Sequence, residues 1–149
     1  MAIQKPAENS AALRVAPGPL VGPVLSRLIG MMAARASCPV DRLENALLVA
    51  DALAAHGPAH VLDGSLDVVI TTAERSLELS VGPLRPDGGS ALLAETAIPG
   101  VGNVIERIVD VVSVDPDPDG EGEILVLRIE FDDAVDKGAS VTGEPMSRG

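Results

Sequence analysis

Residues 66–81, LDVVITTAERSLELSV, are the part of the sequence that decides the fold. Apolar side chains occupy alternate positions in both halves of this stretch: Leu66, Val68 and Ile70, then Leu77, Leu79 and Val81. Alternation with a period of two is typical of a β-strand that buries one face. The short polar link from Ala73 to Arg75 joins the halves, so the stretch predicts an antiparallel hairpin.

Helices are predicted on the N-terminal side of this hairpin. Leu20 to Ala36 and Val40 to His56 both carry apolar residues at the spacing of a helix with one buried face. Asp41 stands where an N-cap would begin the second helix, and Glu44 follows three residues later, as in a capping box. Ala12 to Ala16 alternates in character and predicts a short strand before the helices.

Further elements are predicted after the hairpin. Leu84 to Gly89 is rich in proline and glycine and predicts a loop, while Ser90 to Ala97 predicts a short helix or a mobile segment. Residues 99–102 are expected to open a third strong helix, because apolar residues from Val101 to Val112 share one helical face. The end of that helix, Val111 to Val114, alternatively begins a strand.

Two last elements complete the predicted domain. Asp115 to Gly122 indicates an acidic turn, and Ile124 to Phe131 alternates as a strand does. This order of elements predicts an α+β fold, a two-layer sandwich with helices on one face of an antiparallel or mixed sheet. We expect one domain over residues 12–132, between an N-terminal tail of residues 1–11 and a disordered polar tail of residues 133–149. The predicted core includes Leu47, Ile105 and Leu127.

The composition limits the kinds of partner. The chain has 149 residues, a formal net charge of -11, one cysteine and 1% aromatic residues. That charge repels nucleic-acid phosphates, and base stacking needs aromatic faces, so a protein partner with a basic surface is favoured and nucleic acid is not. Cys38 cannot form an internal disulfide; we interpret it as a small apolar filler and expect a cytoplasmic protein. No apolar run reaches membrane-spanning length, so no membrane partner is expected.

Three short stretches stand out beside the order of elements. They are LLVADALAAH at residues 47–56, LELSVGPLRPDGG at residues 77–89 and GVGN at residues 100–103. Together with the order of elements they resemble the Bergerat-fold, or histidine-kinase-like, ATPase superfamily over about Leu13 to Phe131. The nearest resemblance within it is to the bacterial anti-sigma-factor serine kinases.

The first stretch resembles the helix that carries the catalytic groups of this family. In the family, a Glu on the second helix acts as general base, and an Asn four residues later holds the magnesium ion; a spacing of four puts both on one helical face. Asp51 stands at the Glu position, and Ala55, which cannot bind a metal, stands at the Asn position. The alternative interpretation of Asp51 is an ordinary solvated helix residue.

The other two stretches resemble the nucleotide-binding turns of the family. The family reads adenine with the Asp of an Asp-x-Gly-x-Gly turn; here Asp87 and Gly88 come a few residues late, as a displaced remnant or an ordinary loop. Gly100, Gly102 and Asn103 match the Gly-x-Gly turn that precedes a phosphate-binding helix N-terminus, although a plain loop-to-helix turn has the same form.

The resemblance implies a regulator whose catalytic motifs are eroded. We expect a degenerate anti-sigma-factor-like protein that binds a sigma factor or an anti-anti-sigma-type regulator, with weak or no binding of ATP and magnesium. The alternative is an active ATP-dependent serine kinase. A homodimer is also left open, because relatives often dimerise.

Two metal-binding patterns are incomplete. Residues 115–120 fit the opening of a calcium loop of the EF-hand type, but Val126 stands where a bidentate Glu is required, which favours a solvated turn. His56 and His60 have the spacing of helical zinc ligands, but the Gly57-Pro58 pair between them breaks the helix.

Overall fold

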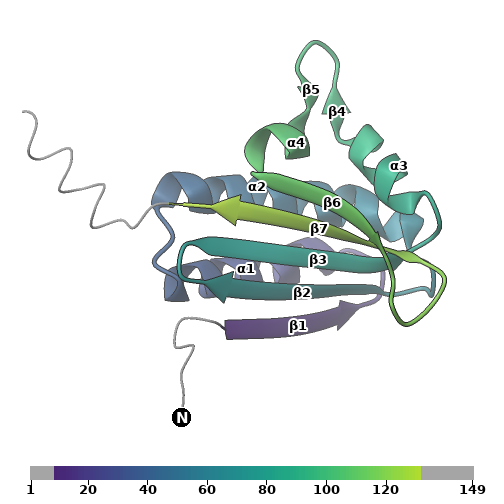
Figure 1. Ribbon diagram of the computed structural model, residues 1–149, viewed down its shortest axis with the longest axis horizontal. Helices are drawn as coiled ribbons and strands as arrows, with labels where there is room; N and C mark the ends of the chain where they lie inside the picture. Colours follow the sequence, from purple (N-terminus) through teal and green to yellow (C-terminus); the bar gives the residue numbers. More distant parts are fainter. Residues whose placement is uncertain (1–8, 132–149) are drawn as a thin grey trace, which may run out of the picture.

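The predicted hairpin forms the middle of a five-stranded antiparallel sheet (Figure 1). In the computed structural model, which describes residues 9–131, the strand order is β1-β2-β3-β7-β6. Val68 pairs with Val81 and Ile70 with Leu79, so the alternating apolar residues of both strands share one face. The strands of this sheet are β1 (Asn9–Val15), β2 (Leu66–Ala73), β3 (Ser76–Leu84), β6 (Val111–Pro116) and β7 (Glu123–Glu130).

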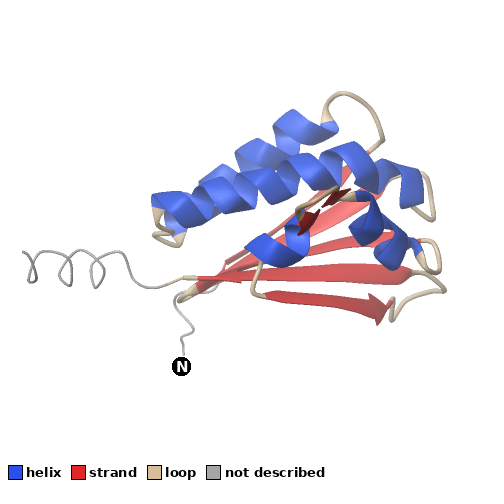
Figure 2. Ribbon diagram, turned by 90° about the horizontal axis from the view of Figure 1, so that it is seen from above, coloured by secondary structure: helices blue, strands red, loops and turns tan. Residues whose placement is uncertain are grey.

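All the helices of the described residues lie on one side of this sheet, which makes the molecule an α+β sandwich of two layers, as predicted (Figure 2). The two long helices pack against each other and cover the sheet, and the C-terminal part of the helical layer is built of shorter pieces. These elements are α1 (Val21–Arg35), α2 (Val40–His56), the 3₁₀ helix η1 (Gly57–His60), α3 (Gly88–Glu95), α4 (Val104–Ile108) and a small hairpin of β4 (Ala97–Ile98) and β5 (Gly102–Asn103).

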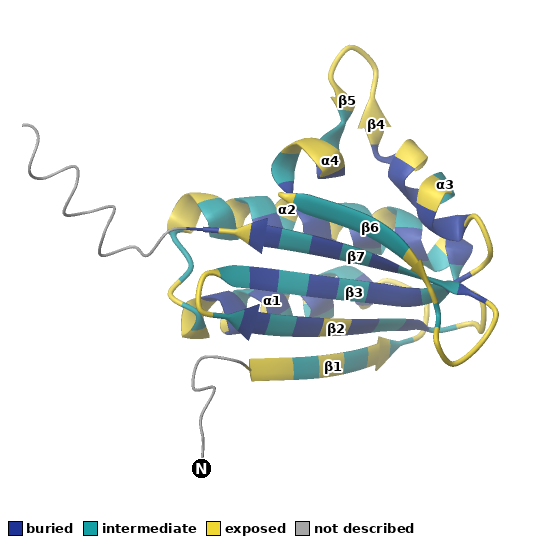
Figure 3. Cartoon of the chain, in the orientation of Figure 1, coloured by how far each residue is buried: buried dark blue, intermediate teal, exposed yellow. Residues whose placement is uncertain are grey.

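The core lies between the sheet and the helices, and aliphatic side chains fill almost all of it. Phe131 is the one aromatic residue of the chain, and it is buried at the end of the sheet. Burial alternates along β2, β3 and β7, as a sheet with one buried face requires (Figure 3). The fully buried large side chains are Leu25, Ile29, Leu53, Leu66, Ile70, Leu77, Leu79, Leu84, Leu92, Ile105, Leu125 and Leu127.

The second helix has its predicted length but a different buried face. Leu47 was predicted to be in the core, yet it is only half-buried; the buried positions are Ala46, Val49, Ala50 and Leu53. The predicted capping box is also wrong. Pro39 is the N-cap residue, no side chain caps the helix, and Asp41 lies in the first turn, where its charge suits the positive end of the helix dipole.

The predicted third long helix is wrong, and α4 has only five residues. Gly100 and Gly102 adopt φ of +82° and +98°, which no α-helix contains, so the chain makes the β4–β5 turn instead. The helix ends at Ile108 because Val109 is extended, and the β-branched residues that follow form β6. The alternative start of a strand near Val111 is therefore confirmed.

Smaller differences concern the borders of other elements. β1 begins at Asn9, before the predicted Ala12, because its backbone continues to pair with β2. The predicted loop of residues 84–89 is shorter, since β3 runs to Leu84 and α3 begins at Gly88. The predicted tail of residues 133–149 lies outside the described residues.

The degree of burial predicts how truncations of core leucines rank. Leu127→Ala removes a fully buried side chain from β7 and should lower the free energy of unfolding by about 2–5 kcal/mol. Leu47→Ala should cost clearly less, about 1 kcal/mol, because Leu47 is only half-buried. Chemical denaturation of both variants measures this difference.

The control is Leu48→Ala, which changes a neighbouring leucine that is 54% exposed and should shift stability by less than about 0.5 kcal/mol. Equal losses for Leu47→Ala and Leu127→Ala would contradict the burial of α2 described above.

Candidate functional site

Asp51, the residue at the position of the family's general base, lies on the solvent-facing side of α2. Its side chain is exposed, and it makes no hydrogen bond or ion pair with any residue from 9 to 131. Ala55, one turn later, is exposed as well. The spacing of four thus does put both positions on one face, as predicted, but no contact orients the Asp51 carboxylate for chemistry.

Asp87 and Gly88 form the turn that starts α3, and a side chain from β7 already occupies this turn. The Asp87 N–H donates to Glu123 Oε2 and the Gly89 N–H donates to Glu123 Oε1, both at 3.1 Å. One carboxylate therefore binds two of the backbone N–H groups that a helix N-terminus leaves without partners. Glu123 was not apparent from the sequence, because it lies 34 residues beyond Gly89 and only the pairing of β3 with β7 brings it close.

The two glycines of this turn allow close packing between elements. A Cβ atom at Gly89 would lie 2.8 Å from Val114 Cγ1, and one at Gly88 would lie 3.2 Å from Leu84 Cβ. Both glycines are buried, so their backbone lies against β3 and β6. The glycines are therefore explained by the packing of α3 on the sheet, in agreement with the ordinary-loop interpretation of this turn.

Asn103 connects three segments of the small helical subregion. Its Oδ1 atom accepts from the Glu106 N–H at 3.1 Å and caps α4, and it also accepts from the Thr96 hydroxyl at 3.2 Å. Its Nδ2 group donates to the Leu93 carbonyl oxygen at the end of α3. Every polar atom of the Asn103 side chain is thus engaged within the fold.

Gly100 and Gly102 lie in the turn and second strand of the β4–β5 hairpin. Both residues are exposed, and a Cβ atom at either would meet nothing within 4 Å. Their positive φ angles, and not a close approach of backbone to a ligand, explain why glycine stands there.

These residues do not fit a bound magnesium nucleotide. The Glu123 carboxylate accepts from the N–H groups at the start of α3 and would repel a phosphate group or the acceptor nitrogens of adenine there. The helix α4 is short, and the Asn103 side chain already caps its N-terminus. Two cavities, of about 700 and 560 Å³, lie elsewhere. Neither is lined by Asp51, Asp87, Gly88, Gly100, Gly102 or Asn103.

His56 and His60 meet at one carboxylate, which the sequence did not reveal. Glu95, at the end of α3, places Oε1 at 3.4 Å from His56 Nδ1 and Oε2 at 3.0 Å from His60 Nε2. The helix α2 ends before Gly57-Pro58 and the chain continues as η1, which directs the imidazole of His60 toward α3. Contact with His60 lowers the pKa of the Glu95 carboxyl, partial burial opposes this shift, and the charges of His60 and His56 add to it.

The remaining polar groups do not form a metal site. Among the described residues, no group of three or more His, Cys, Asp or Glu side chains is placed to hold a metal ion. The acidic turn is held by its own hydrogen bonds, because the Asp119 N–H donates to Asp117 Oδ1 at 2.9 Å and the Asp117 N–H donates to the Gly122 oxygen.

Burial raises the pKa of the Cys38 thiol to about 11, so this residue behaves as the apolar filler that the sequence suggested.

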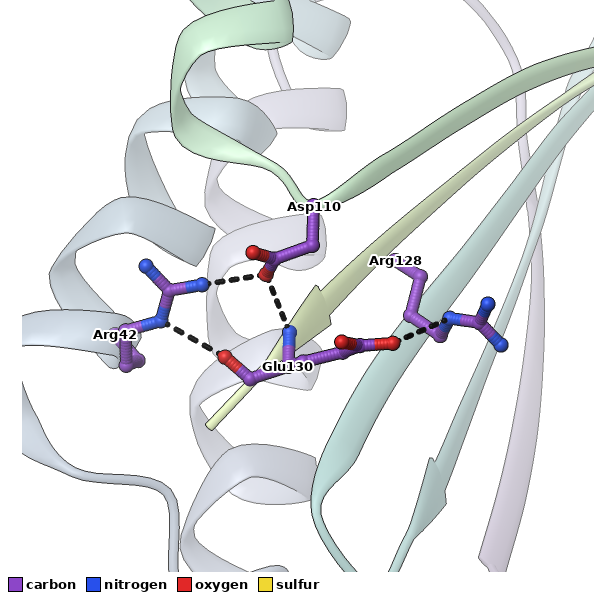
Figure 4. A network of polar contacts seen from close by, with 4 residues as sticks. All are labelled: Arg42, Asp110, Arg128 and Glu130. Atoms are coloured by element: carbon purple, nitrogen blue, oxygen red, sulfur yellow. Dashed lines mark hydrogen bonds and ion pairs between the residues drawn. The ribbon is translucent and has the colours of Figure 1, made fainter. Parts of the chain in front are cut away.

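An arginine–carboxylate network ties α2 to the far end of the sheet (Figure 4). Arg42 Nη2 donates to Asp110 Oδ2 at 2.6 Å, and Arg42 Nε donates to the Glu130 carbonyl oxygen at 3.1 Å. The Glu130 N–H also donates to Asp110 Oδ2, at 2.7 Å. The adjoining cavity of about 700 Å³ is lined by three arginines and three carboxylates, so it has no net charge with which to select an ion. This network is best explained as a structural connection between the two layers.

A scan of the chain against protein-family models finds no match, and a search of curated proteins finds none either. Within residues 9–131, no helix combines the length and the apolar character that crossing a membrane requires. The resemblance to anti-sigma-factor kinases therefore stays a prediction, and the site must be judged from its own contacts.

The contact of Glu123 with α3 should have a measurable effect on stability. Glu123→Ala leaves the Asp87 and Gly89 N–H groups without their carboxylate and should lower the free energy of unfolding by about 1–3 kcal/mol. Amide exchange at these two positions should also become faster. Glu121→Ala, in the exposed turn nearby, is the control and should change stability by less than about 0.5 kcal/mol. Equal effects of the two substitutions would show that the Glu123 contact is not formed in solution.

The lowered pKa of Glu95 predicts a specific acid response. A carboxyl group whose pKa is lower in the folded state contributes stability that is present above its unfolded pKa and is lost as pH falls through the folded pKa. The free energy of unfolding of Glu95→Gln should therefore fall less steeply than that of the parent protein below about pH 4.5. Denaturation curves between pH 3 and 6 test this. His60→Asn removes the largest cause of the shift and should flatten the slope similarly; an unchanged slope in both variants would exclude the contact.

Proposed function

We propose that this chain is a regulatory protein of the anti-sigma type, which acts by binding a protein partner and has weak or no ATP binding. The partner that we propose is a sigma factor or an anti-anti-sigma-type regulator with a basic surface. The proposed site of action is the cytoplasm, in keeping with the single cysteine of the chain.

The proposal is supported by the contacts of the chain's own side chains at the turns that resemble the nucleotide-binding motifs of the family. Glu123 binds the N–H groups at the start of α3, and Asn103 binds the N–H of Glu106 in α4. Ala55 replaces the magnesium-holding Asn. Phosphoryl transfer depends on positioning groups and on a metal to neutralise developing charge. With these groups replaced or engaged, binding is the function that the remaining surface supports best.

Charge supports a protein partner of basic character. The chain has 22 Asp and Glu residues against 11 Lys and Arg residues. Such an excess steers positively charged partners toward the surface and repels nucleic-acid phosphates. Several of the arginines are also engaged within the fold: Arg14 with Asp67, Arg42 with Asp110 and Arg128 with Glu130. Each of these ion pairs also occupies one carboxylate, so the excess of 11 negative charges remains.

The proposal is tested by binding measurements with purified partners. Each sigma factor and each anti-anti-sigma-type regulator encoded by the source genome is titrated against the labelled chain, at about 0.1 M and 0.5 M salt, with and without magnesium ATP. We expect one of them to bind without nucleotide and to bind more weakly at high salt, because exposed charges are screened over about 10 Å at 0.1 M. Added ATP should neither release this partner nor lead to a phosphoserine that mass spectrometry detects.

Asp51→Ala separates this proposal from the serine-kinase alternative. If Asp51 were a general base, its loss would abolish phosphate transfer; we expect no transfer in the parent protein and unchanged partner binding in the variant. Phosphorylation of the partner, lost in Asp51→Ala, would establish the kinase and overturn the proposal. Failure of the whole panel to bind would overturn the anti-sigma type of function.

A further inference from the structure

The β4–β5 hairpin projects from the body of the molecule beyond α3 and α4 (Figure 1). Ala97 pairs with Asn103 and Ile98 with Gly102, and residues 99–101 form the tip. All residues from 97 to 102 are exposed (Figure 3). The tip therefore contributes little to the core, and the stability of the fold does not account for the type of side chain found there.

The side chains at the tip are apolar. Ile98 is 49% exposed and Val101 is 48% exposed, with Pro99 between them, also exposed. A single exposed apolar residue is ordinary, but two exposed β-branched residues at the end of a projecting hairpin concentrate apolar surface there. We call Ile98, Pro99 and Val101 the apolar tip.

The hairpin is held firmly although it pairs over only two residues on each strand. At its base, Asn103 binds the Leu93 carbonyl oxygen and the Thr96 hydroxyl. Near its end, Arg107 Nη1 donates to the Val101 carbonyl oxygen at 3.0 Å, and the Val101 N–H donates to the Ile98 oxygen at 2.9 Å. An isolated hairpin of this size would be unstable in water, so these contacts fix its shape in advance. A binding element that is already ordered loses less conformational entropy when it docks.

Acidic side chains stand at both ends of the hairpin. Glu95 precedes it at the end of α3 and Glu106 follows it in α4, and both are exposed. Arg107 directly follows Glu106, and its guanidinium donates to the Val101 oxygen. The Glu95 carboxylate faces His56 and His60, so Glu106 is the carboxylate at the base of the apolar tip that has no ion-pair partner among residues 9–131.

We propose that the apolar tip is the docking element of this chain, and that it inserts into an apolar pocket of a protein partner whose rim carries a Lys or Arg side chain facing Glu106. This inference rests on the proposed function and specifies which surface performs it. Apolar residues at the centre of a contact, surrounded by complementary charges, are the arrangement that gives most interfaces both affinity and orientation.

The test compares the double variant Ile98→Ser/Val101→Ser with the parent protein, using the partner that binds in the panel of purified sigma factors and anti-anti-sigma-type regulators. Removing two half-exposed apolar side chains from the contact should weaken binding about tenfold or more. The free energy of unfolding should change little, because the tip lies outside the core. Glu106→Gln should weaken binding less, but should reduce its dependence on salt.

Val40→Ser is the matched control, because it makes the same change as Val101→Ser at a residue that is 70% exposed, at the start of α2. It should bind as the parent protein does. If the double variant also binds as the parent does, the partner docks elsewhere and the inference is overturned while the proposed function stands. If the parent protein binds no member of the panel, the proposed function fails, and this assignment fails with it.

Discussion

The antiparallel pairing of β3 with β2 on one side and β7 on the other is the interaction on which the rest of the structure depends. It brings the buried faces of three strands together under α1 and α2, where aliphatic side chains alone must fill nearly the whole core. The same pairing sets the chemistry of the α3 region. Leu84 at the end of β3 pairs with Glu123 at the start of β7, so the Glu123 carboxylate lies beside the first N–H groups of α3.

The spacing of apolar residues predicted most of the fold, because the periods of strands and helices can be recognised within short stretches of the sequence. The hairpin of residues 66–81, both long helices and the last strand are confirmed in place. The segment after Pro99 was predicted wrongly because its apolar residues fit a helix and a turn-plus-strand equally well. The structure has a turn there because Gly100 and Gly102 adopt positive φ, which glycine allows without strain. The face of α2 was misjudged because its many alanines make the apolar stripe broad; burial selects Ala46 and Leu53 over Leu47.

The candidate site was less predictable than the fold, since it depends on residues far apart in the chain. Glu123 and Glu95 were both missed, and each gains its importance only when β7 or α3 is brought beside its partners. The His56 and His60 side chains both contact the Glu95 carboxylate, which their spacing in the sequence does not indicate. The residues that were singled out, Asp51, Gly100 and Asn103 among them, are explained by exposure, turn geometry and capping.

Glu123 and Asn103 accept from the N–H groups of Asp87, Gly89 and Glu106, and amide chemical shifts test our proposal that these groups are closed to a nucleotide. Nitrogen-15 labelled protein is titrated with magnesium ATP to about 5 mM, several-fold above the roughly 1 mM upper end of ordinary KM values, while the N–H signals of Asp87, Gly89 and Glu106 are followed. The account predicts that these three signals do not move, because Glu123 and Asn103 already accept from them. Saturable shifts of these signals, lost when magnesium is removed by a chelator, would contradict it.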